Sequence, residues 1–382
     1  MTPSRRFSRG RSTALAAGCL TLIAALTACS STSTPAPGSA GSSGAGGASS
    51  NAGASGKPVH LGMELLLAGL PFVSELQAGG QAAAHELGDV QLDVSAPATF
   101  DPPGAISQVN NFLASGVDGV AVAPEPAPLW TRALTDAVSK TKGNTVTLQT
   151  PPAASTTVKS YVGIDTAAYG RQVATETIKA AGLGPDTTGE VIIGICTPQS
   201  TPLATTVAAM SDAVKQALPK ATVLKPFNSE SVPSQNFAAW EQQMRAHPDA
   251  VLTLGSCDQD GESMIKAKRV SGGKFAIGGV ATTPTVLGAL EDGTVAAIVN
   301  QNWYVEGYTA IRLLTEAARN GRIPVEGWIN SGTTLVTKAN VADIRARDAS
   351  PEGQAAYYKP LITKLWADLP AATKPLSDVQ SS

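Results

Sequence analysis

The sequence predicts an α/β protein in which two domains of similar pattern follow one another along the chain. From Lys57 onwards, short β-rich runs alternate with helical stretches, as in a mostly parallel sheet covered by helices. The series starts again after Asp165 with elements of similar length. The two halves do not repeat in sequence, so their similarity is architectural and does not indicate a solenoid.

Each half is predicted from its runs of β-rich and helical residues. In the first half, strands are expected at 59–66, 90–95, 118–123, 145–149 and 160–164, and helices at 72–87, 103–115 and 128–140. In the second half, strands are expected at 190–196, 222–227, 250–255, 275–280 and 295–301, and helices at 168–181, 203–218, 235–246, 260–270 and 284–291.

The amino-terminal residues predict export from the cytoplasm. Arginines lie between residues 5 and 11 without any acidic residue, and an apolar run from Ala14 to Ala28 follows them. This is typical of a secretory signal peptide, and the run is short for a membrane span. It ends in Leu26-Thr27-Ala28-Cys29, which resembles the bacterial lipobox. We therefore expect residues 1–28 to be removed and Cys29 to carry lipid, the alternative being an ordinary signal peptide with a chance cysteine.

Residues 29–56 are expected to form a disordered tether behind this lipid. They consist almost entirely of Ser, Gly, Ala, Thr and Pro after Cys29 and carry no charge, so they cannot bury enough apolar surface to offset the entropy of ordering. Beyond residue 57, the sequence has no further apolar stretch long enough to cross a membrane.

The charge of the exported part argues against a nucleic-acid partner. Removing four signal arginines from the 28 basic residues leaves 24 against 30 acidic residues, a formal charge of −6. Phosphate binding needs a concentrated basic face, which this balance does not favour.

Local motifs in a fixed order carry a family resemblance. They are Leu70-Pro71-Phe72-Val73, Gly116-Val117-Asp118-Gly119-Val120, Tyr161-Val162-Gly163-Ile164-Asp165, Ala246-His247-Pro248-Asp249-Ala250, and Val299-Asn300-Gln301-Asn302 followed by Gly307-Tyr308. Over about residues 57–338 the chain resembles the type I periplasmic binding proteins, in particular the ribose-binding branch of sugar-importer receptors.

The resemblance implies two doubly wound parallel-sheet domains joined by a three-segment hinge, with a ligand held between them. The crossings would fall near Asp165, near Gln301 and at 329–332. The first domain would then comprise 57–165 and 302–330, and the second 166–301 and 331–382 with a carboxy-terminal extension. The tail beyond Lys338 passes the family's usual end. Its apolar stripe at helical spacing predicts packing against a domain, and its members are Tyr357, Tyr358, Leu361, Leu365, Trp366 and Leu369.

The resemblance also implies which positions bind the ligand. The family's aromatic contact corresponds to Phe72, for which packing in the core is the alternative. Positions of polar family contacts fall at Gln149, Thr206, Cys257 with Asp258 beside it, and Ala281, whereas Gln301 keeps the family's residue.

Further candidates follow from their place in the chain. Leu66 adds an apolar wall where the first strand enters the cleft. Glu125 and Trp130 follow the strand that stops at Pro124, the alternatives being a solvated carboxylate and a tryptophan packed on the sheet. Because charged groups that normally hold sugars are replaced, we expect a less charged pocket and a small neutral hydroxylated ligand such as a sugar, a sugar derivative or a polyol.

Two cysteines remain in the folded part, and we expect them to pair. Cys196 ends the first strand of the second domain and Cys257 lies just past the third. These strands are neighbours in the doubly wound order, and the compartment is oxidising, so a disulfide at the cleft edge is predicted. Two buried free thiols are the alternative.

The sequence does not indicate an enzyme. It lacks a G-x-S-x-G elbow, a phosphate loop and an H-E-x-x-H zinc motif, so no catalytic residue, metal site or cofactor is expected. We expect a monomeric, extracytoplasmic receptor on the membrane that delivers its ligand to an ABC transporter permease. A receptor that signals to a membrane sensor kinase and a structural lipoprotein without a ligand are the alternatives.

Overall fold

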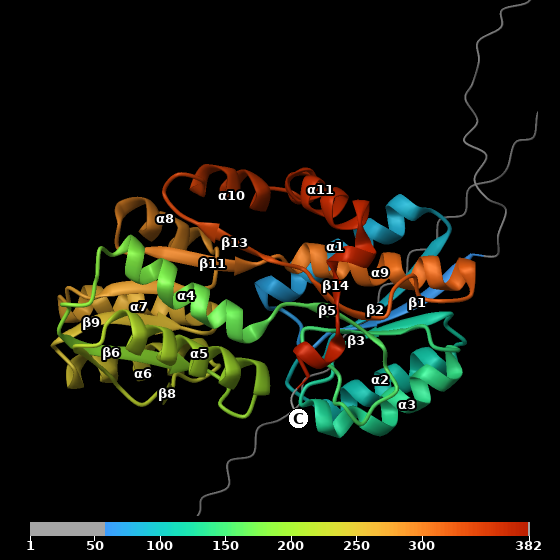
Figure 1. Ribbon diagram of the computed structural model, residues 1–382, viewed down its shortest axis with the longest axis horizontal. Helices are drawn as coiled ribbons and strands as arrows, with labels where there is room; N and C mark the ends of the chain where they lie inside the picture. The colour runs from blue at the N-terminus through green and yellow to red at the C-terminus, as the bar shows by residue number, and fades with distance from the viewer. Residues whose placement is uncertain (1–57, 381–382) are drawn as a thin grey trace, which may run out of the picture. The chain divides into compact units, whose positions relative to one another are not determined.

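A sheet of mostly buried strands forms the centre of each lobe of the molecule (Figure 1). The computed structural model describes residues 58–380. In the first lobe, β3 (Gly119–Val122) and β4 (Thr145–Leu148) are buried at every position. Parallel strands of this kind need cover on both faces, and helices supply it.

The first lobe contains a sheet in the order β14-β12-β5-β4-β3-β1-β2, parallel except for the pair β12·β14. Its remaining strands are β1 (Val59–Glu64), β2 (Val90–Ser95), β5 (Ser160–Gly163), β12 (Gly327–Asn330) and β14 (Thr373–Lys374). Helices α1 (Pro71–Leu87) and α9 (Trp303–Asn320) cover one face. The other face is covered by α2 (Pro102–Ala114), the 3-10 turn η1 (Ala127–Trp130) and α3 (Thr131–Lys140).

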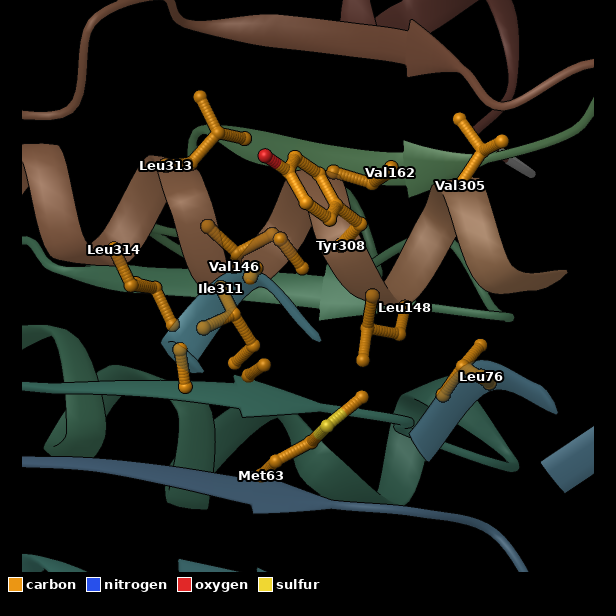
Figure 2. Close-up of a cluster of buried hydrophobic side chains, with 14 of the residues drawn as sticks. Met63, Leu76, Val146, Leu148, Val162, Val305, Tyr308, Ile311, Leu313 and Leu314 are labelled. Carbon is orange, nitrogen blue, oxygen red and sulfur yellow. The ribbon is translucent and has the colours of Figure 1, made fainter. Parts of the chain in front are cut away.

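The core of the first lobe lies between α9 and the strands below it. Tyr308, Ile311 and Leu314 of α9 form one buried apolar cluster with Met63, Val146 and Leu148 of the sheet, and Tyr308 lies near Val162 (Figure 2). Helices α1 and α9 approach closely because Gly79 of α1 lies against the carbonyl of Tyr304 and Gly307 of α9 lies against the carbonyl of Leu76, where a Cβ atom would collide. This close contact fixes the start of both helices, which matters for the cavity described below.

The second lobe contains a sheet in the order β13-β11-β10-β9-β6-β7, with β8 also paired to β6. Its strands are β6 (Gly189–Ile195), β7 (Ala221–Val223), β8 (Phe227–Asn228), β9 (Ala250–Gly255), β10 (Ala276–Gly279), β11 (Ala297–Gln301) and β13 (Thr333–Val336). Helices α4 (Thr166–Ala180) and α5 (Thr201–Ala217) cover one face. The other face is covered by α6 (Pro233–Ala246), α7 (Asp258–Ser271), α8 (Pro284–Asp292) and α10 (Val341–Asp348).

The chain passes between the lobes after β5, after β11 and between β12 and β13. The predicted fold class, two α/β domains with mostly parallel sheets, is therefore confirmed. Small differences concern the element ends: the single strand expected at 222–227 is split into β7 and β8, and the helix expected at 128–140 begins with η1.

The tail differs from the expected domain division. After α10, which packs on the second lobe, the chain crosses again into α11 (Pro351–Ala367), α12 (Leu369–Ala372), β14 and the turn η2 (Leu376–Asp378). Tyr358, Ile362 and Leu369 join the core of the first lobe, and β14 pairs with β12. The assignment of all of 331–382 to the second lobe was wrong, because α11 packs on α1 and α9 of the first lobe (Figure 1). Of the predicted apolar stripe, Tyr358 and Leu369 are buried there, Tyr357, Leu365 and Trp366 are partly buried, and Leu361 is exposed.

The predicted signal peptide (1–28), the lipidated Cys29 and the tether (29–56) lie outside the described residues. Within residues 58–380, no helix combines the length and apolarity needed to cross a membrane.

Candidate ligand-binding cleft

A cavity of about 270 Å³ lies between the two lobes. It is formed where α1 and α9 begin in the first lobe and where β10 and β11 end in the second, which is the edge at which open α/β sheets bind ligands. Its lining residues are Pro71, Phe72, Glu75, Asp258, Ala281, Thr282, Thr283, Pro284, Asn300, Trp303, Asp348 and Gln354. The volume is near the lower end of the usual range for small-molecule sites, roughly 300–1,000 Å³.

An aromatic pair forms one side of the cavity. Phe72 of α1 and Trp303 of α9 are half-buried, and their ring centroids are 4.9 Å apart at an interplanar angle of 38°. The proximity of the two helix starts brings the rings together. Aromatic faces of this kind suit the C–H surface of a sugar ring.

Two carboxyl groups of the cavity have raised pKa values. Burial raises the pKa of Asp258 from 3.8 to about 6, the nearby charge of Asp260 adds to the effect, and a hydrogen bond from the backbone N–H of Phe72 opposes it. Asp258 begins α7 of the second lobe, so this contact with Phe72 spans the cleft. Burial also raises the pKa of Glu75 from 4.5 to about 7, against the charge of Arg347 and a hydrogen bond from Tyr358. With Asp348 included, the lining thus contains three carboxyl groups where we expected few acidic residues, and burial favours the neutral form of two of them.

A buried hydrogen-bond network around Arg347 supports the cavity from behind. The guanidinium group donates to both carboxylate oxygens of Asp348 at 2.7 and 2.9 Å and to the Tyr358 hydroxyl at 2.9 Å. It also donates to Asn300 of β11 at 3.1 Å and to Thr282 at 3.0 Å in the second lobe. All five guanidinium N–H groups are thereby used.

This network continues into the first lobe through Tyr358. The Tyr358 hydroxyl donates to Glu75 of α1 at 2.6 Å, and the Tyr358 ring stacks on Tyr304 of α9 at 5.1 Å. A continuous chain of hydrogen bonds therefore runs from β11, through Arg347 and Tyr358, to Glu75. We call Arg347, Asp348, Tyr358, Glu75, Asn300 and Thr282 the Arg347 cluster.

A disulfide lies at the second lobe's edge of the cleft. Cys196 follows β6 and Cys257 precedes α7, and the structure joins them. Strands β6 and β9 are adjacent in the sheet, which brings the two cysteines together. The backbone N–H of Cys257 donates to Asp260, closing the first turn of the helix that carries Asp258.

The structure brings part of the predicted site together. Of the positions taken from the sequence, Phe72, Asp258 and Ala281 line the cavity, with Cys257 next to Asp258. Leu66, Glu125 and Trp130 instead line a separate hollow of about 10 Å³ together with Glu64, which is too small for a sugar.

Glu125 and Trp130 form hydrogen bonds with other residues of the chain and do not line the cavity. The buried carboxylate of Glu125 accepts a hydrogen bond from Thr150 at 2.8 Å, and burial raises its pKa against further hydrogen bonds from Thr201 and Ser200 at the start of α5. Glu125 thus contacts the second lobe rather than solvent. Trp130 is buried in the core between α2 and α3 and donates its indole N–H to the Glu125 carbonyl at 3.3 Å.

Three other predicted residues lie outside the cavity lining. The Thr206 hydroxyl donates to the Thr166 carbonyl at 3.2 Å, where α5 packs closely on α4, so it has a structural role. Gln149 adopts a positive φ of 59° and donates its backbone N–H to Glu306 at 2.6 Å, while its buried side-chain oxygen has no partner among the described residues. Gln301 ends β11 at a crossing and hydrogen-bonds to Tyr169.

Sequence reasoning missed Glu75 and Asp348, two of the three acidic residues of the lining, and also Gln354. Glu75 lies on the buried face of α1, one residue before Leu76, and a carboxylate within an apolar helix face was the available signal. Asp348 and Gln354 lie in the tail, for which the family resemblance supplied no positions. No three His, Cys, Asp or Glu residues in the range 58–380 are grouped so as to hold a metal ion.

Comparisons with known proteins agree with this architecture. A profile of the periplasmic binding protein domain matches residues 67–322, which is more than half of the chain. No curated protein sequence matches it.

Several solved structures have the same fold at low sequence identity. A solute-binding protein of an ABC transporter from Burkholderia graminis, solved with D-arabinose, is 21% identical with a TM-score of 0.67, covering 74% of this chain and 96% of its own. The glucose-galactose binding protein of Geobacillus stearothermophilus is 23% identical with a TM-score of 0.65, covering 75% and 99%. A solute-binding protein from Agrobacterium vitis with bound D-fucose is 20% identical with a TM-score of 0.66, covering 74% and 96%. By its family profile and its fold, the chain belongs to the type I periplasmic binding proteins.

Proposed function

We propose that the protein is a lipid-anchored, extracytoplasmic solute-binding protein that captures a small neutral hydroxylated ligand and delivers it to an ABC importer. The observation that carries this proposal is the cavity between the lobes, which combines an aromatic pair with carboxylates and amides. Sugars are bound by this combination, because hydroxyl groups donate to carboxylates while ring C–H surfaces stack on aromatic rings.

The solved neighbours support the ligand class. Two of them hold D-arabinose or D-fucose, and a third is named for binding glucose and galactose. Their identities are too low to carry a ligand over to this chain, but they favour monosaccharides as the first compounds to test.

Thermal unfolding with a panel of sugars and polyols tests this function. The panel contains D-arabinose, D-fucose, D-galactose, D-glucose and myo-inositol, and isothermal titration calorimetry follows for each compound that raises Tm. A ligand that binds only the folded state at 100 times its Kd adds about 2.7 kcal/mol to the free energy of unfolding. Phe72→Ala should abolish the response, whereas Lys142→Ala, an exposed change on the turn after α3, should keep it. If the whole panel leaves Tm unchanged, the sugar and polyol class is wrong.

Anchoring and delivery need separate measurements. Metabolic labelling with palmitate should mark the wild-type chain and not Cys29→Ala, and the variant should be released from the membrane. Uptake of the radiolabelled ligand by cells should fall when the gene is deleted, and uptake equal to that of wild-type cells would exclude the transport function. We further propose that the protein catalyses no reaction, because its family consists of binding proteins.

A further inference from the structure

The carboxy-terminal tail reaches the cavity although it lies beyond the family profile, which ends at residue 322. Helix α10 packs on the second lobe and α11 packs on the first. The short connection between them therefore crosses from one lobe to the other at the border of the cavity. Asp348, the last residue of α10, and Gln354, in the first turn of α11, both line the cavity.

The turn before α11 determines where Gln354 lies. The Ser350 hydroxyl accepts a hydrogen bond from the Gly353 backbone at 3.0 Å and caps the helix. Gly353 lies against the carbonyl of Ala346, and a Cβ atom there would collide with it. The connection is thus fixed on both sides, and Gln354 is held at the cavity wall.

Asp348 is oriented by Arg347 and still has capacity for a ligand. Each carboxylate oxygen accepts one hydrogen bond from Arg347, whereas a carboxylate has about four acceptor positions. The Asp348 side chain retains 29% of its accessible surface. Arg347 itself has no N–H left to donate, so the ligand contact from this part of the tail falls to Asp348.

Gln354 complements this acceptor. Its side-chain amide makes no hydrogen bond with another described residue, and it can both donate and accept. A carboxylate and an amide that line the same cavity match a ligand with several hydroxyl groups.

We propose that the carboxy-terminal extension forms a third wall of the ligand site, in addition to the walls formed by the two lobes. In this wall, Asp348 and Gln354 contact the ligand and contribute to the specificity of the site. The proposal rests on the proposed function, since it concerns the same cavity. It adds residues that lie outside the matched family domain.

Calorimetric titration of D-arabinose, D-fucose and D-galactose into the wild-type protein, Asp348→Asn and Gln354→Ala tests this proposal. Losing a hydrogen bond to the charged carboxylate should weaken binding about tenfold or more, and losing the neutral amide should weaken it about threefold. Asp343→Asn on α10 and Lys359→Ala on α11 are matched controls, because both side chains are exposed on the same helices away from the cavity. They should bind like the wild type.

The outcomes separate this inference from the proposed function. If the wild type binds a sugar and both Asp348→Asn and Gln354→Ala bind it equally well, the third wall is wrong and the proposed function stands. If the wild type binds none of the sugars, the proposed ligand class is wrong, and the proposed role of Asp348 and Gln354 in binding it is wrong as well. Asp348→Asn also loses part of the ion pair with Arg347, so its Tm is measured alongside. Gln354→Ala breaks no internal hydrogen bond and decides the matter if Asp348→Asn is unstable.

Discussion

Apart from Asp348, the Arg347 cluster differs from the front of the cavity, formed by Phe72, Trp303 and Asp258, in how fully its polar groups are satisfied. Arg347 is completely buried and donates all of its N–H groups to other side chains. At the front, Asp258 has a raised pKa and half-buried aromatic rings face open space. Both regions lie between the lobes and contribute to the same cavity lining.

The difference separates groups that stabilise the fold from groups that can bind a ligand within the same cleft. A polar group whose partners all come from the chain has nothing left for a ligand, and its loss damages the fold. A polar group held in place with free acceptor positions can exchange water for ligand hydroxyls at little cost. We therefore expect changes in the cluster to act mainly on stability, except at Asp348, which keeps free acceptor positions, and changes at the front to act mainly on affinity.

The largest effect is expected from Arg347→Met. Removing a buried cation leaves Asp348 and Glu75 without their partner, which typically costs about 3–5 kcal/mol. Denaturant unfolding measures the loss. Arg345→Met on the same helix is the control, because Arg345 pairs with Glu291 at the surface and should matter little. Equal losses in the two variants would contradict the division between the regions.

Reduction of the disulfide should have the next largest effect. Cys196 and Cys257 are 61 residues apart in sequence, and opening a loop of this size typically costs about 2–4 kcal/mol. A phosphine reductant should lower the denaturation midpoint of the wild type and leave the double variant Cys196→Ser/Cys257→Ser unchanged. Since Cys257 precedes Asp258, sugar affinity should fall as well. If the denaturation midpoint of the wild type is the same with and without the reductant, the disulfide does not contribute to stability.

A smaller, pH-dependent effect is expected at Asp258. Its pKa is about 6 in the folded protein against an ordinary value of 3.8, so between these values the folded protein binds more protons at this group than the unfolded chain does. The contribution of the Asp258 carboxyl to the free energy of unfolding is fully present below about pH 4 and is lost as the pH rises through about 6. Asp258→Asn removes this dependence.

The measurement for Asp258 is a difference between two stability curves. From about pH 4 to pH 7, the free energy of unfolding of the wild type should fall by about 1 kcal/mol more than that of Asp258→Asn, allowing for the partial exposure of the group. Asp343→Asn, an exposed change, should follow the wild type. Parallel curves for wild type and Asp258→Asn would show that the carboxyl titrates normally.

The sequence predicted the fold well because the fold depends on periodic burial. Strands that are buried on both faces read as short apolar runs, and amphipathic helices alternate with them, so the element types follow from local pattern. The crossings near Asp165 and Gln301 were predicted from the family resemblance. The placement of the tail did not follow, because an apolar stripe says that a helix is buried but not on which lobe. Val341 and Ile344 of α10 pack on the second lobe, whereas Tyr358 of the next helix packs on the first.

The site was harder to predict for a related reason. Phe72, Asp258 and Ala281 follow strand or helix ends in the family order, so the resemblance placed them in the cavity. Thr206 was placed by the same reasoning, but its hydroxyl is used between two helices. The acidic groups of the Arg347 cluster depend on contacts across hundreds of residues, such as Tyr358 with Glu75, that no local pattern contains.

The smallest effect on stability is expected from Phe72→Leu, which separates the two regions most sharply. Leucine keeps most of the apolar volume but removes the ring pair with Trp303, and such pairs contribute about 0.5–1.5 kcal/mol. The free energy of unfolding should therefore change by about 1 kcal/mol or less, far below the loss for Arg347→Met. Sugar affinity should nevertheless fall about tenfold, since the ligand loses an aromatic face. Intrinsic fluorescence, to which Trp303 and the four other tryptophans contribute, is titrated with the sugar that binds the wild type and reports the affinity. If Phe72→Leu lowers stability as much as Arg347→Met and leaves the affinity unchanged, the front of the cavity is part of the structural core and the ligand binds elsewhere.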